Sequence, residues 1–318
     1  MPEPVQPPLP QFEVRLEAPD LGPWREGSHG IRGFVTRVAA RPGPHVALIA
    51  LSHGNELAGA IVLDRLLREE VHPTRGRLTF GFGNLDAFDR FDPARPTLSR
   101  FVDEDINRVW DEAVLDGPRR SAELARAREM RPLIDTVDVL LDLHSMLWPS
   151  DPLMLCGGSD KGRRLAAGIG VPELVVSDEG HVGGRRLIDY TRFRDPNTAC
   201  AANLIEAGQH WEPATVETTL AGVAGLLNYL EMAPPNLRPP ERRPQRFATV
   251  TRAVTAATSG FSFVQPWRGG DVVARRNTLI AIDGNEQIRT PHDDCLLVMP
   301  SLRPSRGHTA VRLARFVS

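Results

Sequence analysis

Two histidines and two glutamates stand at or just after the ends of short apolar runs. His53 and Glu56 follow HVALIALS in the motif HGNE, His144 ends VDVLLDLH, and Glu206 ends the run NLIE. An open α/β sheet binds its ligands where the carboxyl ends of its strands converge. Imidazole nitrogens and carboxylate oxygens are ordinary zinc ligands. The four residues therefore predict a metal site with a catalytic carboxylate.

Three of these residues are the expected metal ligands. His53, Glu56 and His144 would supply three protein donors and leave a position for water, as catalytic zinc sites do. Glu206 is the candidate general base and acid, because a carboxylate beside the metal but not bonded to it can move a proton. A fourth-ligand role for Glu206 is the alternative, and it would close the site. Asp142 in DLHS would either orient a ligating ring or simply be a polar residue of its strand.

A long polar loop, residues 85–117, is the second candidate for function. It contains RFVDEDINRVW, in which Arg100, Asn107 and Arg108 could hydrogen-bond a substrate. Guanidinium groups match carboxylates in a two-pronged geometry. Loops of this length in a compact α/β unit are usually functional or disordered. The alternative is a solvated run of charges, but the density of polar groups beside a tryptophan favours a substrate-facing role.

The elements that must position these side chains alternate between strands and helices. Apolar runs of strand length and amphipathic helical patterns succeed one another from His45 to about Met232. This alternation is the pattern of an α/β fold with a mixed, mostly parallel sheet flanked by helices. Strands are expected at 45–51, 77–84, 137–144, 154–158, 173–179 and 202–208, and helices at 56–70, 120–135 and 216–232.

Changes in composition predict the domain organisation. Proline-rich segments stand at the N-terminus and at 233–245, APPNLRPPERRPQ, and short strand-like runs separated by Gly, Pro and Asp turns follow the second segment. A proline-rich polar stretch suits an extended linker. We expect a flexible N-terminus at 1–12, a catalytic domain at 13–232, a linker at 233–245 and a small all-β domain at 246–318 that caps the active site.

Composition limits the classes of function. The 318 residues carry 38 basic and 40 acidic side chains, so the net charge is −2 and no basic field exists to attract nucleic acid or an anionic membrane. No apolar run approaches the roughly 18 residues of a membrane span. The three cysteines, Cys156, Cys200 and Cys295, leave an odd thiol and lack CxxC spacing. That usage indicates a reducing compartment, and we expect a cytoplasmic protein.

Four motifs together carry a family resemblance. HGNE, RFVDEDINR, DLHS and IEAGQ occur in this order over about residues 45–230, with strand-like runs behind them. In order and rough spacing they resemble the succinylglutamate desuccinylase and aspartoacylase family, relatives of the zinc carboxypeptidases. The resemblance implies a zinc carboxypeptidase-like fold and one Zn²⁺ per chain, held by His53, Glu56 and His144. It also implies that Glu206 is the general base and acid.

Further residues acquire roles only through this resemblance. It implies that Arg100 polarises the scissile carbonyl, while Asn107 and Arg108 bind the carboxylate of the amino-acid half of a substrate. The family's Tyr-x-x-x-Arg element is matched by YTRFR, which supplies Tyr190 and Arg194 as substrate-binding residues and leaves Arg192 as a rival to Arg194.

One departure from the family concerns specificity. Aspartoacylase uses a tyrosine from its C-terminal domain, whereas the two tyrosines of this chain, Tyr190 and Tyr229, both precede residue 246. The sequence therefore does not predict a preference for N-acetylaspartate.

These observations predict a zinc-dependent hydrolase that cleaves the amide bond of an N-acyl amino acid. Its partner would be a small-molecule substrate, with no nucleic acid and no membrane, and homo-oligomerisation stays open. One alternative is a metallocarboxypeptidase that acts on peptide C-termini, because the metal triad would be shared. Another is a non-catalytic protein of the same fold that uses its arginines to hold a carboxylate ligand.

Overall fold

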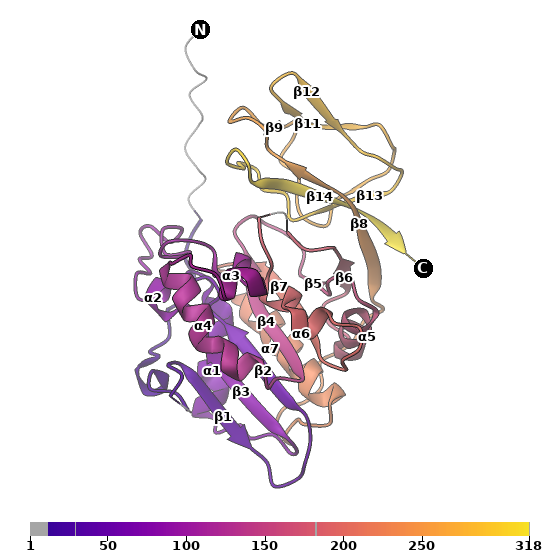
Figure 1. The fold of residues 1–318 in the computed structure, drawn as a ribbon. Coiled ribbons are helices and arrows are strands. Elements are labelled where there is room, and N and C mark those ends of the chain that lie inside the picture. Colours follow the sequence, from indigo (N-terminus) through magenta and orange to yellow (C-terminus); the bar gives the residue numbers. More distant parts are fainter. Residues whose placement is uncertain (1–11, 29, 182, 318) are drawn as a thin grey trace.

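Eleven strands form one continuous mixed sheet (Figure 1). The structure is a computed structural model that describes residues 12–28, 30–181 and 183–317. The strand order is β1-β3-β2-β4-β7-β5-β6-β8-β14-β13-β10. The predicted flexible N-terminus lies outside the described residues apart from Phe12. No helix in the described part of the chain is long and apolar enough to cross a membrane.

Four parallel strands make the centre of this sheet. They are β2 (His45–Ala50), β3 (Arg77–Phe82), β4 (Val139–Met146) and β7 (Ala201–Gln209). Every residue of β2 and β4 is buried, which is expected of strands covered on both faces. On one side β1 (Phe34–Val38) pairs antiparallel with β3. On the other, β5 (Leu153–Leu155) pairs antiparallel with β7 and parallel with β6 (Leu174–Ser177).

Helices cover both faces of the central strands because successive strand residues point to opposite sides. Leu48 belongs to a core cluster with helices on one face, and Ile49 belongs to a second cluster on the other. The first cluster includes residues of α1 (Leu57–Arg68), α2 (Leu85–Phe88), α5 (Asp160–Ile169) and α7 (Pro213–Tyr229). The second includes residues of α3 (Glu112–Leu115), α4 (Ala122–Ile134), α6 (Thr191–Arg194), η2 (Ile106–Arg108) and η3 (Leu187–Asp189). A short 3-10 helix, η1 (Gly22–Trp24), precedes β1.

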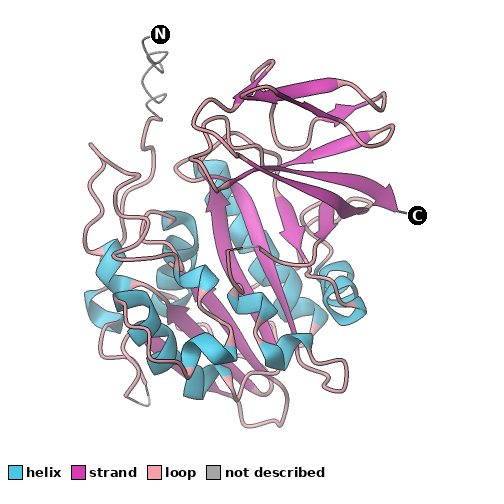
Figure 2. Ribbon diagram, turned by 45° about the horizontal axis from the view of Figure 1, so that its top comes forward, coloured by secondary structure: helices cyan, strands magenta, loops and turns pink. Residues whose placement is uncertain are grey.

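The C-terminal part continues the same sheet. β8 (Arg246–Thr255) pairs parallel with β6 and antiparallel with β14 (Thr309–Val317), which pairs in turn with β13 (Cys295–Val298). β10 (Val272–Val273) ends the sheet, and β9 (Ser262–Phe263), β11 (Leu279–Asp283) and β12 (Glu286–Arg289) form a second, three-stranded sheet. Figure 2 shows that the helices lie in the larger part of the molecule and that strands and loops make up the C-terminal part.

The predicted fold class is confirmed: a mixed sheet flanked by helices, with a C-terminal β region. Among the elements that were not predicted are β1 and α5. β1 is five residues long, with one buried, three half-buried and one exposed residue, and α5 is ten residues long. Both are short, so their patterns carry little signal. The predicted loop 85–117 contains the short elements α2, η2 and α3. The predicted domain boundaries at residues 232 and 245 stay a proposal. β8 begins at Arg246, as the predicted C-terminal domain does, but it pairs with β6 of the catalytic part.

Candidate metal centre and active site

The turn after β2 carries the first two predicted ligands. Leu51 follows the strand with a φ of 58°, a left-handed conformation that L residues seldom adopt, and it reverses the chain toward His53. Gly54 lies against the segment 87–99: a Cβ there would come within 2.4 Å of the Ala87 carbonyl carbon. Only glycine permits this approach. Glu56 is the N-cap residue of α1, so strand, turn and helix fix both side chains.

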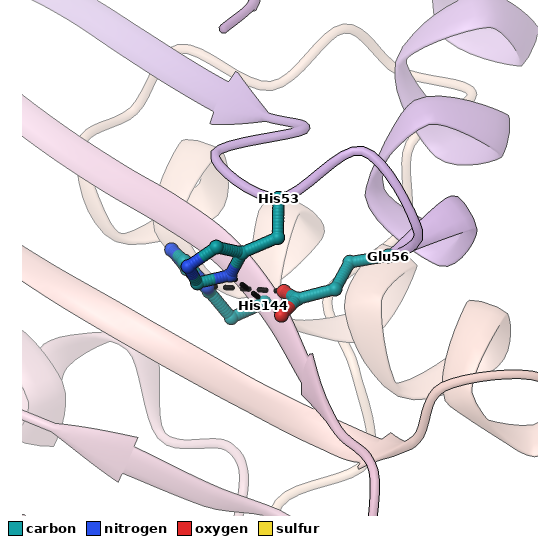
Figure 3. Close-up of side chains that lie close together, drawn as sticks. All are labelled: His53, Glu56 and His144. Atoms are coloured by element: carbon teal, nitrogen blue, oxygen red, sulfur yellow. Dashed lines mark hydrogen bonds and ion pairs between the residues drawn. The ribbon is translucent and has the colours of Figure 1, made fainter. Parts of the chain in front are cut away.

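His53, Glu56 and His144 come together in the structure (Figure 3). The Nδ1 of His53 lies 2.7 Å from Oε1 of Glu56, and the Nδ1 of His144 lies 3.0 Å from Oε2 of the same carboxylate. One donor atom from each residue falls within 4.8 Å of the other two. All three residues are buried, with 2–3% of their surface exposed. The turn after β2 and the end of β4 thus converge as the strand-end argument predicted.

The donor set fits a zinc ion. Two imidazole nitrogens and a carboxylate are a common catalytic combination for this metal, with a fourth position left for water. Burial alone would lower the pKa of His144, but the carboxylates of Asp142 and Glu56 outweigh it and raise this pKa well above its ordinary value. The pocket therefore favours positive charge between the rings and the carboxylates. A divalent cation would supply that charge in place of ring protons.

Two aspartates hold the far sides of the rings. The Nε2 of His53 lies 2.9 Å from Oδ1 of Asp105, and the Nε2 of His144 lies 2.8 Å from Oδ2 of Asp142. A carboxylate that accepts the Nε2 hydrogen leaves the lone pair on Nδ1, which is the nitrogen that faces Glu56. Contacts of this kind fix the tautomer and orientation of ligating histidines. Of the two interpretations of Asp142, the structure thus favours the ring-orienting one.

Arg100 lies beside the Nε2 edge of the His53 ring. Its Nη2 is 2.9 Å from Nε2 of His53 and 3.4 Å from Oδ2 of Asp105, and its Nη1 is 3.2 Å from Oε1 of Glu56. The Nε2 of His53 cannot both donate to Asp105 and accept from Arg100. If Nδ1 binds a metal, Nε2 carries the hydrogen and donates to Asp105, so Arg100 bonds the carboxylates alone. Since 37% of its side chain is exposed, Arg100 can also face a substrate.

A buried carboxylate anchors the loop that carries Arg100 and Asp105. Glu123 of α4 has no exposed surface, and its oxygens accept hydrogen bonds from the backbone nitrogens of Val102 (2.6 Å), Asp103 (3.0 Å) and Glu104 (3.1 Å). The Nδ2 of Asn84 donates a fourth bond at 2.9 Å. Glu123 therefore fixes the backbone between two side chains that contact His53.

Glu206 lies next to His144 in the sheet, because the two residues are register partners on β7 and β4. Only 6% of Glu206 is exposed, and its Oε2 has no hydrogen-bond partner among the described residues. Burial raises the pKa of Glu206 to about 8, although the charges of His144 and Arg100 oppose the shift. Glu206 is thus a buried carboxyl with a free oxygen beside the predicted ligands. That is the position expected of a proton carrier.

The structure places Asn107 and Arg108 differently from one another. The amide of Asn107 is engaged at both ends: Oδ1 accepts from the Leu187 backbone at 2.7 Å, and Nδ2 lies 3.5 Å from Asp142 and 3.3 Å from His144. Arg108 donates to the carbonyl of Asn107 at 2.5 Å, and 24% of its side chain stays exposed. Arg108 can therefore contact a ligand directly, whereas the side chain of Asn107 contacts Asp142 and His144. Substrate binding by either residue stays a prediction.

Tyr190 and Arg194, the two residues of the Tyr-x-x-x-Arg element, contact different parts of the molecule. The hydroxyl of Tyr190 donates to Asp135 at 2.7 Å and accepts from Arg131 at 3.1 Å, so these two hydrogen bonds hold Tyr190 at the end of α4 and not in the histidine cluster. Arg194 lines a surface cavity of about 390 Å³ together with Arg108.

The rival arginine lies elsewhere. The Nε of Arg192 donates to the carbonyl of Val137 at 2.7 Å. The structure thus brings Arg194, and not Arg192, to the cavity that Arg108 lines.

Comparisons with known proteins show the fold and a resemblance to one family over part of the chain. Residues 42–167 match the succinylglutamate desuccinylase/aspartoacylase catalytic domain. A stretch of 82 residues is 43% identical to a succinylglutamate desuccinylase of Ectopseudomonas mendocina, covering 24% of this chain and 22% of that protein. The predicted family resemblance is confirmed.

Several solved structures share the fold along most of the chain. A succinylglutamate desuccinylase from Vibrio parahaemolyticus aligns with a TM-score of 0.68 and 17% identity over 90% of this chain and 87% of that one. A succinylglutamate desuccinylase/aspartoacylase from Rhodobacter sphaeroides aligns with a TM-score of 0.65 and 17% identity over 90% and 89%. The ectoine utilization protein EutE (DoeB) from Ruegeria pomeroyi aligns with a TM-score of 0.60 and 16% identity over 88% and 87%.

The segment that matches the succinylglutamate desuccinylase/aspartoacylase catalytic domain contains the three candidate metal ligands and the polar loop 85–117. His53, Glu56 and His144 lie within residues 42–167, and Glu206 follows the matched segment. Sequence reasoning passed over Asp105 and Glu123. Asp105 stands inside the motif RFVDEDINR and could have been proposed from its carboxylate chemistry. Glu123 lies in an ordinary helical pattern, where no sequence signal separates it from a solvated glutamate.

Proposed function

We propose that this protein is a zinc-dependent hydrolase that cleaves the amide bond of an N-acyl amino acid. The observation that carries the proposal is the arrangement of four side chains. His53, Glu56 and His144 converge with their donor atoms within 4.8 Å, and the buried carboxyl of Glu206 lies beside them with one oxygen free. The match of residues 42–167 to a family of deacylases supports the type of reaction.

Zinc, when bound by these three residues, would lower the pKa of a water molecule and polarise the substrate carbonyl. Glu206 would take the proton of the attacking water and hold it in a buried setting. A pKa of about 8 for this carboxyl lets it accept a proton and release it again near neutral pH. Glu206 would then deliver the proton to the amide nitrogen, which leaves as an amine.

Arg100 and Arg108 would bind two different groups of the substrate, the scissile carbonyl and the amino-acid carboxylate. Arg100 contacts Glu56 at 3.2 Å and keeps 37% of its side chain exposed, so it can donate to the carbonyl oxygen as negative charge develops there. Arg108 is the last residue of η2 in the same loop, and it would hold the carboxylate of the amino-acid half. Asn107 and Asp142 would keep the ring of His144 in place.

The proposal is tested by a substrate screen with the zinc-loaded protein. N-acetyl and N-succinyl amino acids with acidic, basic and neutral side chains are compared with short peptides. Release of the free amino acid from the N-acyl compounds supports the proposal, and preferential cleavage of peptides would indicate a carboxypeptidase. Glu206→Gln should lower kcat at least about 100-fold without loss of zinc. Full turnover by this variant would contradict the role of Glu206.

A further inference from the structure

The carboxylate of Glu56 lies between two rings, and each of its oxygens also has a second partner (Figure 3). Oε1 faces the ring of His53 and lies 3.2 Å from Nη1 of Arg100. Oε2 faces the ring of His144 and accepts a hydrogen bond from the backbone nitrogen of Ser145 at 3.1 Å. When a metal takes the two ring nitrogens and Arg100 faces a substrate, the backbone N–H of Ser145 still bonds the carboxylate.

Ser145 stands at an irregular point of the sheet. On β4 and β7, His144 pairs with Glu206. Further along, Met146 pairs with Gln209, so β7 holds one residue more than β4 between these two pairs. Such a β-bulge interrupts the ladder of backbone hydrogen bonds between the strands. Ser145 therefore depends on contacts of its side chain, in addition to the strand, for its position.

His210 supplies that side-chain contact. The hydroxyl of Ser145 lies 2.7 Å from Nδ1 of His210, and both residues are buried, with 4% and 2% of their surfaces exposed. Burial lowers the pKa of His210 to about 3, so the ring is neutral and one of its nitrogens accepts a hydrogen bond from a hydroxyl. The backbone nitrogen of His210 also donates to the carbonyl of Met146 at 2.9 Å, which fixes the ring beside the bulge.

Trp211 connects the same group to the turn that carries Glu56. Its ring lies against the ring of His210, with 5.3 Å between the centroids and 62° between the planes. Its Nε1 donates to the carbonyl of Asn55 at 3.2 Å, and Asn55 directly precedes Glu56. Contacts thus run from Glu56 through Ser145, His210, Trp211 and Asn55 back to Glu56.

We propose that His210 is a positioning residue of the metal centre, which holds Ser145 where the backbone N–H of Ser145 orients the carboxylate of Glu56. This inference rests on the proposed function, and it adds a residue that acts through Ser145 without touching metal or substrate. A ligand that is oriented in advance loses less conformational freedom when the metal binds. Loss of the Ser145–His210 contact should therefore weaken metal binding although all three ligands remain.

The test removes this contact from each end. Ser145→Ala deletes the hydroxyl and keeps the backbone N–H, and His210→Phe deletes the accepting nitrogen and keeps a buried ring. His210→Asn is the rescue variant, because its amide oxygen can take the place of Nδ1 as acceptor. His292→Phe is the matched control: His292 is also buried, and its Nε2 lies 2.9 Å from the hydroxyl of Thr251 in the C-terminal β region.

Zinc affinity is measured by competition with a chelator, and the visible spectrum of the cobalt-loaded protein reports the geometry of the ligands. Ser145→Ala and His210→Phe should each weaken zinc binding about 10-fold and change the cobalt spectrum. His210→Asn should recover most of the affinity, and His292→Phe should match the wild type. Urea unfolding of chelator-treated protein identifies a variant that fails to fold. If His210→Phe is such a variant, Ser145→Ala decides the question, because it removes a single oxygen atom.

Wild-type zinc affinity and an unchanged cobalt spectrum in Ser145→Ala would overturn the proposal. The double variant Ser145→Ala/His210→Phe should bind zinc about as weakly as either single variant, because His210 acts through Ser145. Additive losses, about 100-fold in total, would show that His210 acts by another route and would also overturn it. These measurements do not depend on hydrolysis. If the affinities change as expected and no N-acyl amino acid is cleaved, the proposed hydrolysis fails and the positioning role of His210 stands.

Discussion

The carboxylate of Asp105 accepts the Nε2 hydrogen of His53 at 2.9 Å, across 52 residues of sequence. This contact joins the loop that carries the substrate-binding candidates to a predicted metal ligand. Burial would raise the pKa of Asp105, but its interaction with the His53 ring and the charge of Arg100 hold it well below its ordinary value. The group is thus an ionised hydrogen-bond acceptor, which favours the ring tautomer with a free Nδ1.

Asp105→Asn should weaken zinc binding roughly 10- to 100-fold, because the amide no longer provides a charged acceptor for the ring. The affinity is measured by competition with a fluorescent chelator. Asp103→Asn is the control, since Asp103 lies on the same loop but accepts from the backbone of Ala122 in α4. Equal affinities for Asp105→Asn and the wild type would refute the ring-orienting role.

His144→Ala should lose bound zinc, because it removes one of three ligands and leaves Glu56 and His53 alone. The metal content of the purified protein is measured by mass spectrometry after dialysis, with about one zinc per chain expected for the wild type. His72→Ala serves as the control, since His72 is an exposed residue after α1. Stoichiometric zinc in His144→Ala would show that the cluster is not the metal site.

Glu206→Gln should stabilise the metal-free protein at high pH. Burial raises the pKa of Glu206 to about 8 from its ordinary 4.5. The folded state therefore binds more protons than the unfolded state between these values, and the stability that Glu206 contributes at low pH is lost as the pH rises through about 8. The glutamine of the variant does not titrate. The unfolding free energy of Glu206→Gln, relative to that of the wild type, should therefore increase by a few kcal/mol between about pH 5 and pH 9.

Urea unfolding of chelator-treated protein at the two pH values measures this difference. Glu217→Gln replaces an exposed glutamate of α7 and should follow the wild type at both. If the difference in unfolding free energy between Glu206→Gln and the wild type did not change with pH, Glu206 would have the same pKa in the folded and unfolded states.

Glu123→Gln should destabilise the fold by about 2 kcal/mol and lower kcat/KM, because the amide cannot accept all of the bonds that the carboxylate accepts. Stability is measured by chemical denaturation, and activity is measured on the zinc-loaded protein. Glu112→Gln is the control: Glu112 is exposed at the start of α3. If activity were kept while stability fell, Glu123 would have no part in positioning Arg100 and Asp105.

The central strands could be predicted because the apolar composition of each one indicates that it is buried. The run HVALIA is apolar after His45, and VLLDLH is apolar up to His144 apart from Asp142, so both indicate a covered strand and the region where it ends. His53, Glu56 and His144 stand at such places, and the structure brings them together. Strand β1 shows the limit of this signal, because five residues with a mixed pattern indicate no single partner.

The partner of a strand is also absent from its sequence. The proline-rich segment before Arg246 predicts a break, but it does not indicate that β8 pairs with β6 at the register Leu174 to Arg246. Every strand edge presents the same backbone donors and acceptors, so the choice of partner depends on how the whole chain packs.

The sequence by itself determined the chemistry of the site: two imidazoles, two carboxylates and nearby guanidinium groups at strand ends and in one polar loop. The tertiary structure decided which groups are bonded and which are free. It engaged the amide of Asn107, turned Tyr190 toward Asp135, and left Oε2 of Glu206 without a hydrogen-bond partner in the described chain. Burial and hydrogen bonding depend on contacts between distant segments, whereas residue type is fixed along the chain.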